Sequence, residues 1–180
     1  MPANSVAIRP SAEADVAEIA AIYTDAVLHG TASFEIVPPD ETEMAARRRA
    51  VLAMNLPYLV AEDGGRVLGY AYAAPYRTRP AYRSTVEDSI YVAPDAQGRG
   101  VGRALLTRLI AEAEARGFRQ MVAVIGDSGN VPSIGIHRAL GFSLIGTLRD
   151  VGYKHGRWLD SVLMQRALGA GATTTPTVGA

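Results

Sequence analysis

The sequence predicts an α/β protein of the α+β type, in which a mixed, largely antiparallel sheet is flanked by helices on both faces. Three observations lead to this fold class. The predicted elements follow the order β-α-α-β-β-β-α-β-α-β-β along the 180 residues. Two consecutive strands are joined by Asp63-Gly64-Gly65, a turn that is typical of antiparallel hairpins. Two predicted helices carry their apolar residues on one face, as helices that pack on a sheet do.

The first half of the chain supplies one strand, two helices and then two further strands. Residues 6–9 have the pattern of a short strand, and Ser11 or Asp15 can cap the helix that follows. That helix has apolar residues at helical spacing and ends before Gly30. A second helix is expected from about residue 40 to residue 54, and its triplet Arg47-Arg48-Arg49 is typical of a solvated helix surface. Residues 58–62 and 67–73 are then predicted strands.

The second half alternates strands with helices. Residues 86–92 form a predicted strand, and residues 101–113 follow as an amphipathic helix for which Gly117 is a suitable C-cap. The apolar run 121–125 is typical of a strand buried on both faces. Ser133 is expected to cap a short helix that ends near Gly141. The last two predicted strands are residues 142–148 and 158–165.

Length and composition narrow the functional classes. We expect residues 1–168 to form one domain and residues 169–180, which are rich in Gly, Ala and Thr, to be a disordered tail. Eighteen basic residues balance 18 acidic ones, which argues against electrostatic binding to nucleic acid or a membrane. The absence of cysteine excludes disulfides and a cysteine nucleophile. No signal-peptide pattern is present and the three histidines lack metal-ligand spacing, so we expect a cytoplasmic protein without a metal.

The most informative segment is Gln97-Gly98-Arg99-Gly100-Val101-Gly102, which lies between a predicted strand and an amphipathic helix. Alternate glycines allow a tight turn and close approach of a ligand, and the helix N-terminus points unpaired N–H groups at that turn. Together they favour a cradle for a phosphate or pyrophosphate. The P-loop and dinucleotide-binding patterns do not match, because no lysine follows the turn and Arg103 stands where a third glycine is required. A glycine turn without a ligand is the alternative.

The pattern Gln97-x-x-Gly100-x-Gly102 resembles the acetyl-CoA pyrophosphate loop of the GNAT superfamily of N-acetyltransferases, whose order of elements is similar to the one above. Asn130, Ser133 and residues 139–142 resemble the loop and helix that flank the cofactor in that superfamily. Residues 31–35, 85–92 and 152–160 resemble more specifically its phosphinothricin / methionine sulfoximine acetyltransferase branch. The resemblance implies the GNAT fold, acetyl-CoA as cosubstrate, and N-acetylation of the α-amino group of a small amino-acid analogue such as phosphinothricin, methionine sulfoximine or methionine sulfone.

The same resemblance implies a set of cofactor-binding residues in three short segments. These are Ile90, Tyr91, Val92, Gln97, Gly98, Arg99, Gly100, Val101, Gly102, Arg103, Asn130 and Ser133. Backbone N–H groups of residues 90–92 can also stabilise the developing negative charge on the acetyl carbonyl, if the strand parts from its neighbour there.

Glu87 is the candidate general base, because a substrate amine is mostly protonated at neutral pH and must lose a proton before it attacks. Strand alternation places Glu87 and Ser89 on one face and Asp88 on the other. A register shifted by one residue would bring Asp88 to the substrate instead. A strand-end surface carboxylate without a catalytic role is the alternative.

His137 stands where most of the superfamily has a tyrosine, which departs from the superfamily but matches the closer branch. An imidazole there can protonate or hydrogen-bond the leaving thiolate. An equally weighted alternative is a structural histidine that hydrogen-bonds the cofactor loop or the backbone.

The substrate class depends on residues 76–83, where three arginines and two tyrosines suit the capture of a carboxylate and a second anionic or polar group. The predicted substrate-binding residues are Phe34, Tyr76, Arg77, Arg79, Tyr82, Arg83 and Thr85, with Arg77 and Arg83 favoured over Arg79. A solvated basic loop is the alternative.

Two further readings stay open. In the first, the chain is an acetyltransferase for another amine, such as a protein N-terminus or a polyamine. In the second, it is a non-catalytic acyl-CoA-binding module.

The resemblance also implies a homodimer with Trp158, the only tryptophan, at the subunit contact, although a core position for Trp158 is as compatible with the sequence.

Overall fold

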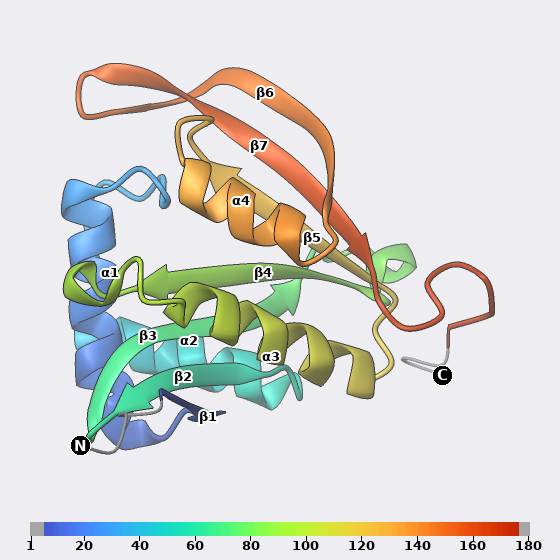
Figure 1. The fold of residues 1–180 in the computed structure, drawn as a ribbon, viewed down its shortest axis with the longest axis horizontal. Helices are drawn as coiled ribbons and strands as arrows, with labels where there is room; N and C mark the ends of the chain where they lie inside the picture. The colour runs from blue at the N-terminus through green and yellow to red at the C-terminus, as the bar shows by residue number, and fades with distance from the viewer. Residues whose placement is uncertain (1–5, 177–180) are drawn as a thin grey trace.

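The computed structural model describes residues 6–176 and contains a seven-stranded sheet in the order β1-β2-β3-β4-β5-β7-β6 (Figure 1). Every neighbouring pair is antiparallel except β4 with β5, so the predicted mixed, largely antiparallel sheet is confirmed. The strands are β1 (Ala7–Pro10), β2 (Tyr58–Asp63), β3 (Arg66–Pro75), β4 (Thr85–Val92), β5 (Gln120–Gly126), β6 (Ser143–Lys154) and β7 (Arg157–Ala167). The helices are α1 (Val16–His29), α2 (Glu41–Ala53), α3 (Val101–Ala115) and α4 (Val131–Ala139).

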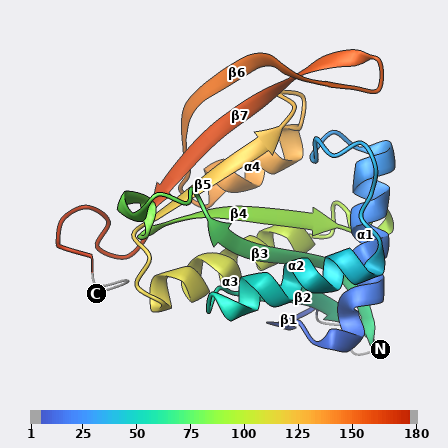
Figure 2. The same cartoon turned by 180° about the vertical axis from the view of Figure 1, so that it is seen from behind.

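The helices cover both faces of the sheet. Figures 1 and 2 show α3 and α4 on one face and α1 and α2 on the other. The apolar stripe of α3 explains its position, because Leu105, Leu106 and Leu109 are each fully buried against the sheet. The loop between α1 and α2 reaches the closed end of the β6–β7 hairpin (Figures 1 and 2).

β4 and β5 separate half-way along their length. Their pairing runs from Thr85↔Gln120 to Asp88↔Ala123 and then ends, while β4 continues beside β3 and β5 continues beside β7. The divergence is visible in Figure 1. It leaves the backbone groups of residues 89–92 that face β5 without a strand partner, so the opening expected at the end of this strand is present.

Several local expectations differ from the structure. Asn130, rather than Ser133, caps α4, because its Oδ1 accepts a hydrogen bond from the Ser133 N–H at 3.3 Å. Neither Ser11 nor Asp15 caps α1 with its side chain; Asp15 accepts instead from the Ala12 N–H at 2.6 Å. β6 and β7 are both longer than expected, since a tight turn between Lys154 and Arg157 extends the hairpin.

Two burial predictions were wrong. β5 is not buried on both faces, because Val124 is 41% exposed on the side left open by the divergence. The arginine triplet is not uniformly solvated, because Arg48 is buried and its guanidinium donates to the Ser11 Oγ at 2.8 Å and the Ser11 carbonyl at 2.6 Å. Both differences come from tertiary contacts that helix or strand patterns do not encode.

The C-terminal segment, expected to be disordered from residue 169, is in part hydrogen-bonded turn structure. The N–H of Gly171 donates to the Leu168 carbonyl at 2.9 Å, and the Arg119 guanidinium donates to the Thr175 carbonyl at 3.0 Å. Residues 177–180 of the expected tail lie outside the described residues.

Candidate active site

The glycine turn forms an open backbone cradle at the N-terminus of α3. Gly98 and Gly100 have φ angles of 73° and 81°, and a Cβ atom at either position would meet nothing within 4 Å. Gly100 is the N-cap of α3 and provides no side-chain cap, so the first N–H groups of the helix are available to an external acceptor. Gly102 lies deeper, where a Cβ would stand 3.5 Å from Ile136 of α4. The turn therefore has the shape and the donors that an anion requires.

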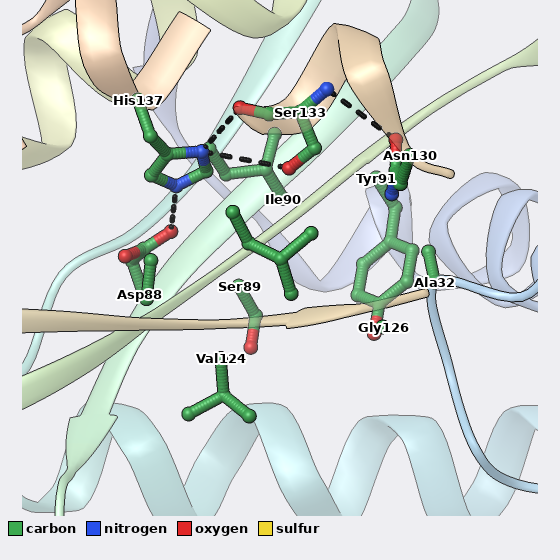
Figure 3. A pocket seen from close by; sticks show the side chains of 12 residues that line it. Ala32, Asp88, Ser89, Ile90, Tyr91, Val124, Gly126, Asn130, Ser133 and His137 are labelled. Atoms are coloured by element: carbon green, nitrogen blue, oxygen red, sulfur yellow. Dashed lines mark hydrogen bonds and ion pairs between the residues drawn. The ribbon is translucent and has the colours of Figure 1, made fainter. Parts of the chain in front are cut away.

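A groove lies in the opening between β4 and β5 (Figure 3). It contains a cavity of about 50 Å³, and residues from β4, β5, α4 and the loop after α1 line it. Four predicted cofactor-binding residues, Ile90, Tyr91, Asn130 and Ser133, are among them. The backbone groups freed by the divergence and the start of α4 thus face one cavity.

Glu87 and Asp88 lie on opposite faces of β4, as strand alternation predicts. Glu87 shares its face with Tyr91, whose ring packs edge-on against Tyr23 of α1 at 4.9 Å between centroids. Burial raises the pKa of the Glu87 carboxyl, the nearby Asp88 charge raises it further, and Arg77 opposes the shift. Asp88 is buried on the α4 side. The register that would turn Asp88 toward the face of Glu87 is therefore not the one adopted.

His137 is buried at the wall of the groove, and both of its ring nitrogens have partners in the chain. Nε2 lies 2.9 Å from Oδ2 of Asp88, and Nδ1 lies 2.7 Å from the Ser133 carbonyl oxygen (Figure 3). Burial opposes the charged form of the ring, but the hydrogen bond and charge of Asp88 outweigh it, so the pKa of His137 is raised. This geometry holds the ring in place through both nitrogens, and a role of His137 at the leaving thiolate stays a prediction.

The predicted substrate-binding residues lie at two separate places. Phe34 is in the loop after α1, against Gly152 at the far end of β6, whereas the arginine loop precedes β4. Figures 1 and 2 both show these loops near opposite ends of β4. Tyr76, Tyr82 and Thr85 line a second cavity of about 240 Å³ together with residues of β5 and β7. Within one chain, the arginine loop therefore lies near Glu87, and Phe34 lies apart from both.

A polar cluster that the sequence did not reveal holds the loop of Phe34. The Lys154 ammonium is buried and donates to the Ser33 carbonyl at 2.7 Å. The Tyr23 hydroxyl lies 2.9 Å from Ser33 Oγ and donates to Glu35 at 2.9 Å. Lys154 had little signal as a buried residue, because a lysine beside a hairpin turn is usually exposed.

A comparison with known proteins identifies the family. Residues 17–142 match the model of the acetyltransferase (GNAT) family. The chain belongs to this family. It is 58% identical over 169 residues to phosphinothricin N-acetyltransferase of Alcaligenes faecalis, an alignment that covers 94% of this chain and 86% of that protein. It is 46% identical to the L-methionine sulfoximine/L-methionine sulfone acetyltransferase of Pseudomonas paraeruginosa, over 89% of this chain and 94% of that protein.

A GNAT superfamily phosphinothricin acetyltransferase from Sinorhizobium meliloti, solved in complex with acetyl-CoA, has the same fold. It superposes with a TM-score of 0.94 and 50% sequence identity, covering 97% of this chain and 94% of that one. The GNAT fold and the resemblance to this branch are therefore confirmed. Within residues 6–176, no helix is long and apolar enough to cross a membrane.

Proposed function

We propose that this GNAT enzyme transfers the acetyl group of acetyl-CoA to the α-amino group of a small amino-acid analogue such as phosphinothricin, methionine sulfoximine or methionine sulfone. One observation carries the proposal: a half-buried carboxylate, Glu87, stands on β4 beside the point where β4 and β5 separate. The names of the two relatives above support the substrate class.

The glycine turn fits the diphosphate of acetyl-CoA. Its open space, its two left-handed glycines and the uncapped N-terminus of α3 suit an anion that must approach the backbone closely. The set proposed from the sequence, residues 97–103 with Ile90, Tyr91, Val92, Asn130 and Ser133, supplies the cradle and the walls of the groove. When bound, acetyl-CoA supplies an activated acetyl thioester.

The chain's own residues then have three tasks. Glu87, whose raised pKa makes it a better proton acceptor than an exposed glutamate, takes a proton from the substrate ammonium directly or through water. The N–H groups of residues 90–92 that β5 no longer covers can donate to an oxygen that becomes negative. The walls of the groove surround these donors, and a ligand that fills the groove would exclude water from them and so strengthen them.

The arginine loop is proposed to select the substrate. Arg77 acts electrostatically on Glu87, which places this positive charge near the base. Arg79, Arg83 and the hydroxyl groups of Tyr76 and Tyr82 add donors for a carboxylate or a tetrahedral acid group. The same positive charge would repel a polyamine, which disfavours that alternative. Phe34 is proposed as an apolar wall and Thr85 as a further polar contact.

We also propose a homodimer in the cytoplasm, where its cosubstrate acetyl-CoA is available. The support for the dimer is an apolar surface on the β6–β7 hairpin. Its exposed large side chains are Leu144, Ile145, Leu148, Val151, Tyr153 and Trp158. Trp158 is 61% exposed in one chain and so is not a core residue. Light scattering that gives the mass of one chain at micromolar concentration would remove this part of the proposal.

The proposal is tested by acetyl-CoA turnover over a panel of amines. The panel contains phosphinothricin, methionine sulfoximine, methionine sulfone, a polyamine and an N-terminal peptide. We expect turnover of the first three, and a kcat about 10²–10⁴-fold lower in Glu87→Gln, since that is the usual contribution of a general base. Glu112→Gln, a matched change on α3, should keep wild-type kcat. Equal activity of Glu87→Gln and wild type would refute the role of Glu87, and no turnover of any amine would favour a non-catalytic acyl-CoA-binding module.

A further inference from the structure

The buried contact between Asp88 and His137 joins β4 to α4 directly beside the groove. Both side chains are only 3% exposed, and the two residues are 49 positions apart in the chain. Figure 3 shows the imidazole between the Asp88 carboxylate on one side and Ser133 on the other. The Ser133 hydroxyl, 3.5 Å from Nδ1, belongs to a residue that lines the cavity. The pair therefore connects the interior of the sheet to the wall of the groove.

The two partners of the ring are both hydrogen-bond acceptors. A backbone carbonyl oxygen cannot donate, so Nδ1 must carry a proton to bond to Ser133 at 2.7 Å. When Asp88 is ionised, its carboxylate cannot donate either, and Nε2 then carries a proton to bond to Asp88 at 2.9 Å. A neutral imidazole has only one N–H group and can satisfy only one of these two acceptors.

The second oxygen of Asp88 strengthens the argument. Asp88 Oδ1 is buried and has no hydrogen-bond partner among residues 6–176. Within the described part of the chain, His137 is thus the side chain that compensates the charge of an ionised Asp88, and an uncompensated charge in this position would be costly.

We propose that Asp88 is a positioning residue that keeps His137 as an oriented imidazolium, so that the positive partner of this ion pair lies on α4 at the wall of the cofactor groove. The charge state of His137 does not depend on the proposed function, whereas the effect of that charge on catalysis rests on it. The ring retains both protons and stabilises, as a cation, a group that becomes negative in the groove, such as a thiolate that leaves with the electron pair of a broken carbon–sulfur bond. Its role is electrostatic and differs from proton donation.

Among residues 6–176, the surroundings of the ring contain no competing charge that would produce the same state. From β4, Asp88 is the neighbour, and Glu87 points to the opposite face. From the segment before β6, the apolar Phe142 packs edge-on against the ring at 5.0 Å between centroids. β5 contributes no titratable side chain between Met121 and Gly126. On the helices, Arg103 at the start of α3 and Arg138 next to His137 in α4 are both exposed.

The protonation state can be measured directly in the protein without cofactor. The chain has three histidines, so long-range ¹H–¹⁵N spectra of histidine-labelled protein give few signals, and His137→Gln assigns the ring of interest. We expect both nitrogens of His137 to be protonated at pH 7.5. In Asp88→Asn, the midpoint of titration should fall by at least about one pH unit, a tenfold loss of proton affinity. Asp88→Glu should keep most of the wild-type affinity, and the exposed His29 and His155 serve as internal references.

The inference is overturned if wild-type His137 is a neutral tautomer at pH 7.5, or if Asp88→Asn leaves its midpoint unchanged. The wild-type spectrum decides the first point even if Asp88→Asn does not fold. In enzyme assays, kcat of Asp88→Asn should fall as the pH rises through the lowered midpoint, with KM for acetyl-CoA nearly constant, whereas wild type should show no such fall there. An enzyme that turns over none of the panel amines would refute the proposed function and leave the spectroscopic result standing.

Discussion

The contact between Gly152 and Phe34 gives a sharp test of the proposed substrate wall. Gly152 lies in β6, and a Cβ atom there would stand 2.5 Å and 2.7 Å from two carbons of the Phe34 ring. Ordinary contacts between carbon atoms are about 3.5–4.0 Å. Gly152→Ala therefore requires the ring to move by about 1 Å.

The size of the effect follows from the exposure of the ring. Phe34 is 39% exposed, so it can tilt toward solvent and β6 need not shift. We expect a loss of stability near the lower end of the range for overpacking, about 1 kcal/mol. A displacement of about 1 Å in a substrate-positioning residue can cost up to about 10²-fold in catalysis, so we expect a roughly tenfold rise of KM for the amine. KM for acetyl-CoA should stay within about twofold, since Phe34 does not line the groove.

Gly146→Ala is the matched control, because Gly146 is in the same strand and a Cβ there would meet nothing within 4 Å. Initial rates with each substrate varied in turn, together with urea unfolding, separate the two variants. If Gly152→Ala and Gly146→Ala have the same KM for the amine, Phe34 does not contact the substrate and the assignment of the wall is wrong.

Four further outcomes are expected. Burial raises the pKa of Glu87 in the folded state, so the contribution of this carboxyl to stability exists at low pH and is lost as the pH rises through the raised pKa. Glu87→Gln should therefore have a higher Tm than wild type at pH 7 and no advantage near pH 4. The pKa of Glu112 is lowered by its arginine neighbours, so Glu112→Gln should instead have a lower Tm at pH 7. Arg48→Met should lose about 2–4 kcal/mol of unfolding free energy in urea, because it leaves the Ser11 carbonyl unpaired. The side chain of Arg49 is 59% exposed, so Arg49→Met should lose less than about 0.5 kcal/mol. Gly100→Ala should cost about 1 kcal/mol through its left-handed φ and should weaken acetyl-CoA binding in calorimetry, and unchanged binding would argue against the cradle.

Local sequence signals predicted the features that depend on local geometry. The hairpin turn at Gly64 and Gly65 and the turn at Gly98 and Gly100 have positive φ angles, which glycine adopts without steric cost. The alternation of β4 also placed Glu87 and Asp88 on the correct faces, because a strand has a period of two residues.

The features that were missed depend on contacts between distant segments. The partner of His137 on β4 could not be found from helix or strand patterns, which carry no information across 49 positions. The apolar run of β5 suggested burial on both faces, but one face is open where β4 departs, so Val124 is exposed within one chain. Arg48 is buried because Ser11 happens to lie beneath α2, and Lys154 because the loop after α1 closes over it.

The central claim is that acetyl-CoA occupies the opening between β4 and β5, with its diphosphate at the glycine turn and Glu87 near its thioester. Crystals of the chain grown with acetyl-CoA test this most directly. We predict electron density for the diphosphate against the N–H groups of residues 98–102 and for the pantetheine arm along residues 89–92. Density at any other place on the molecule, with this groove filled only by solvent, would contradict the claim.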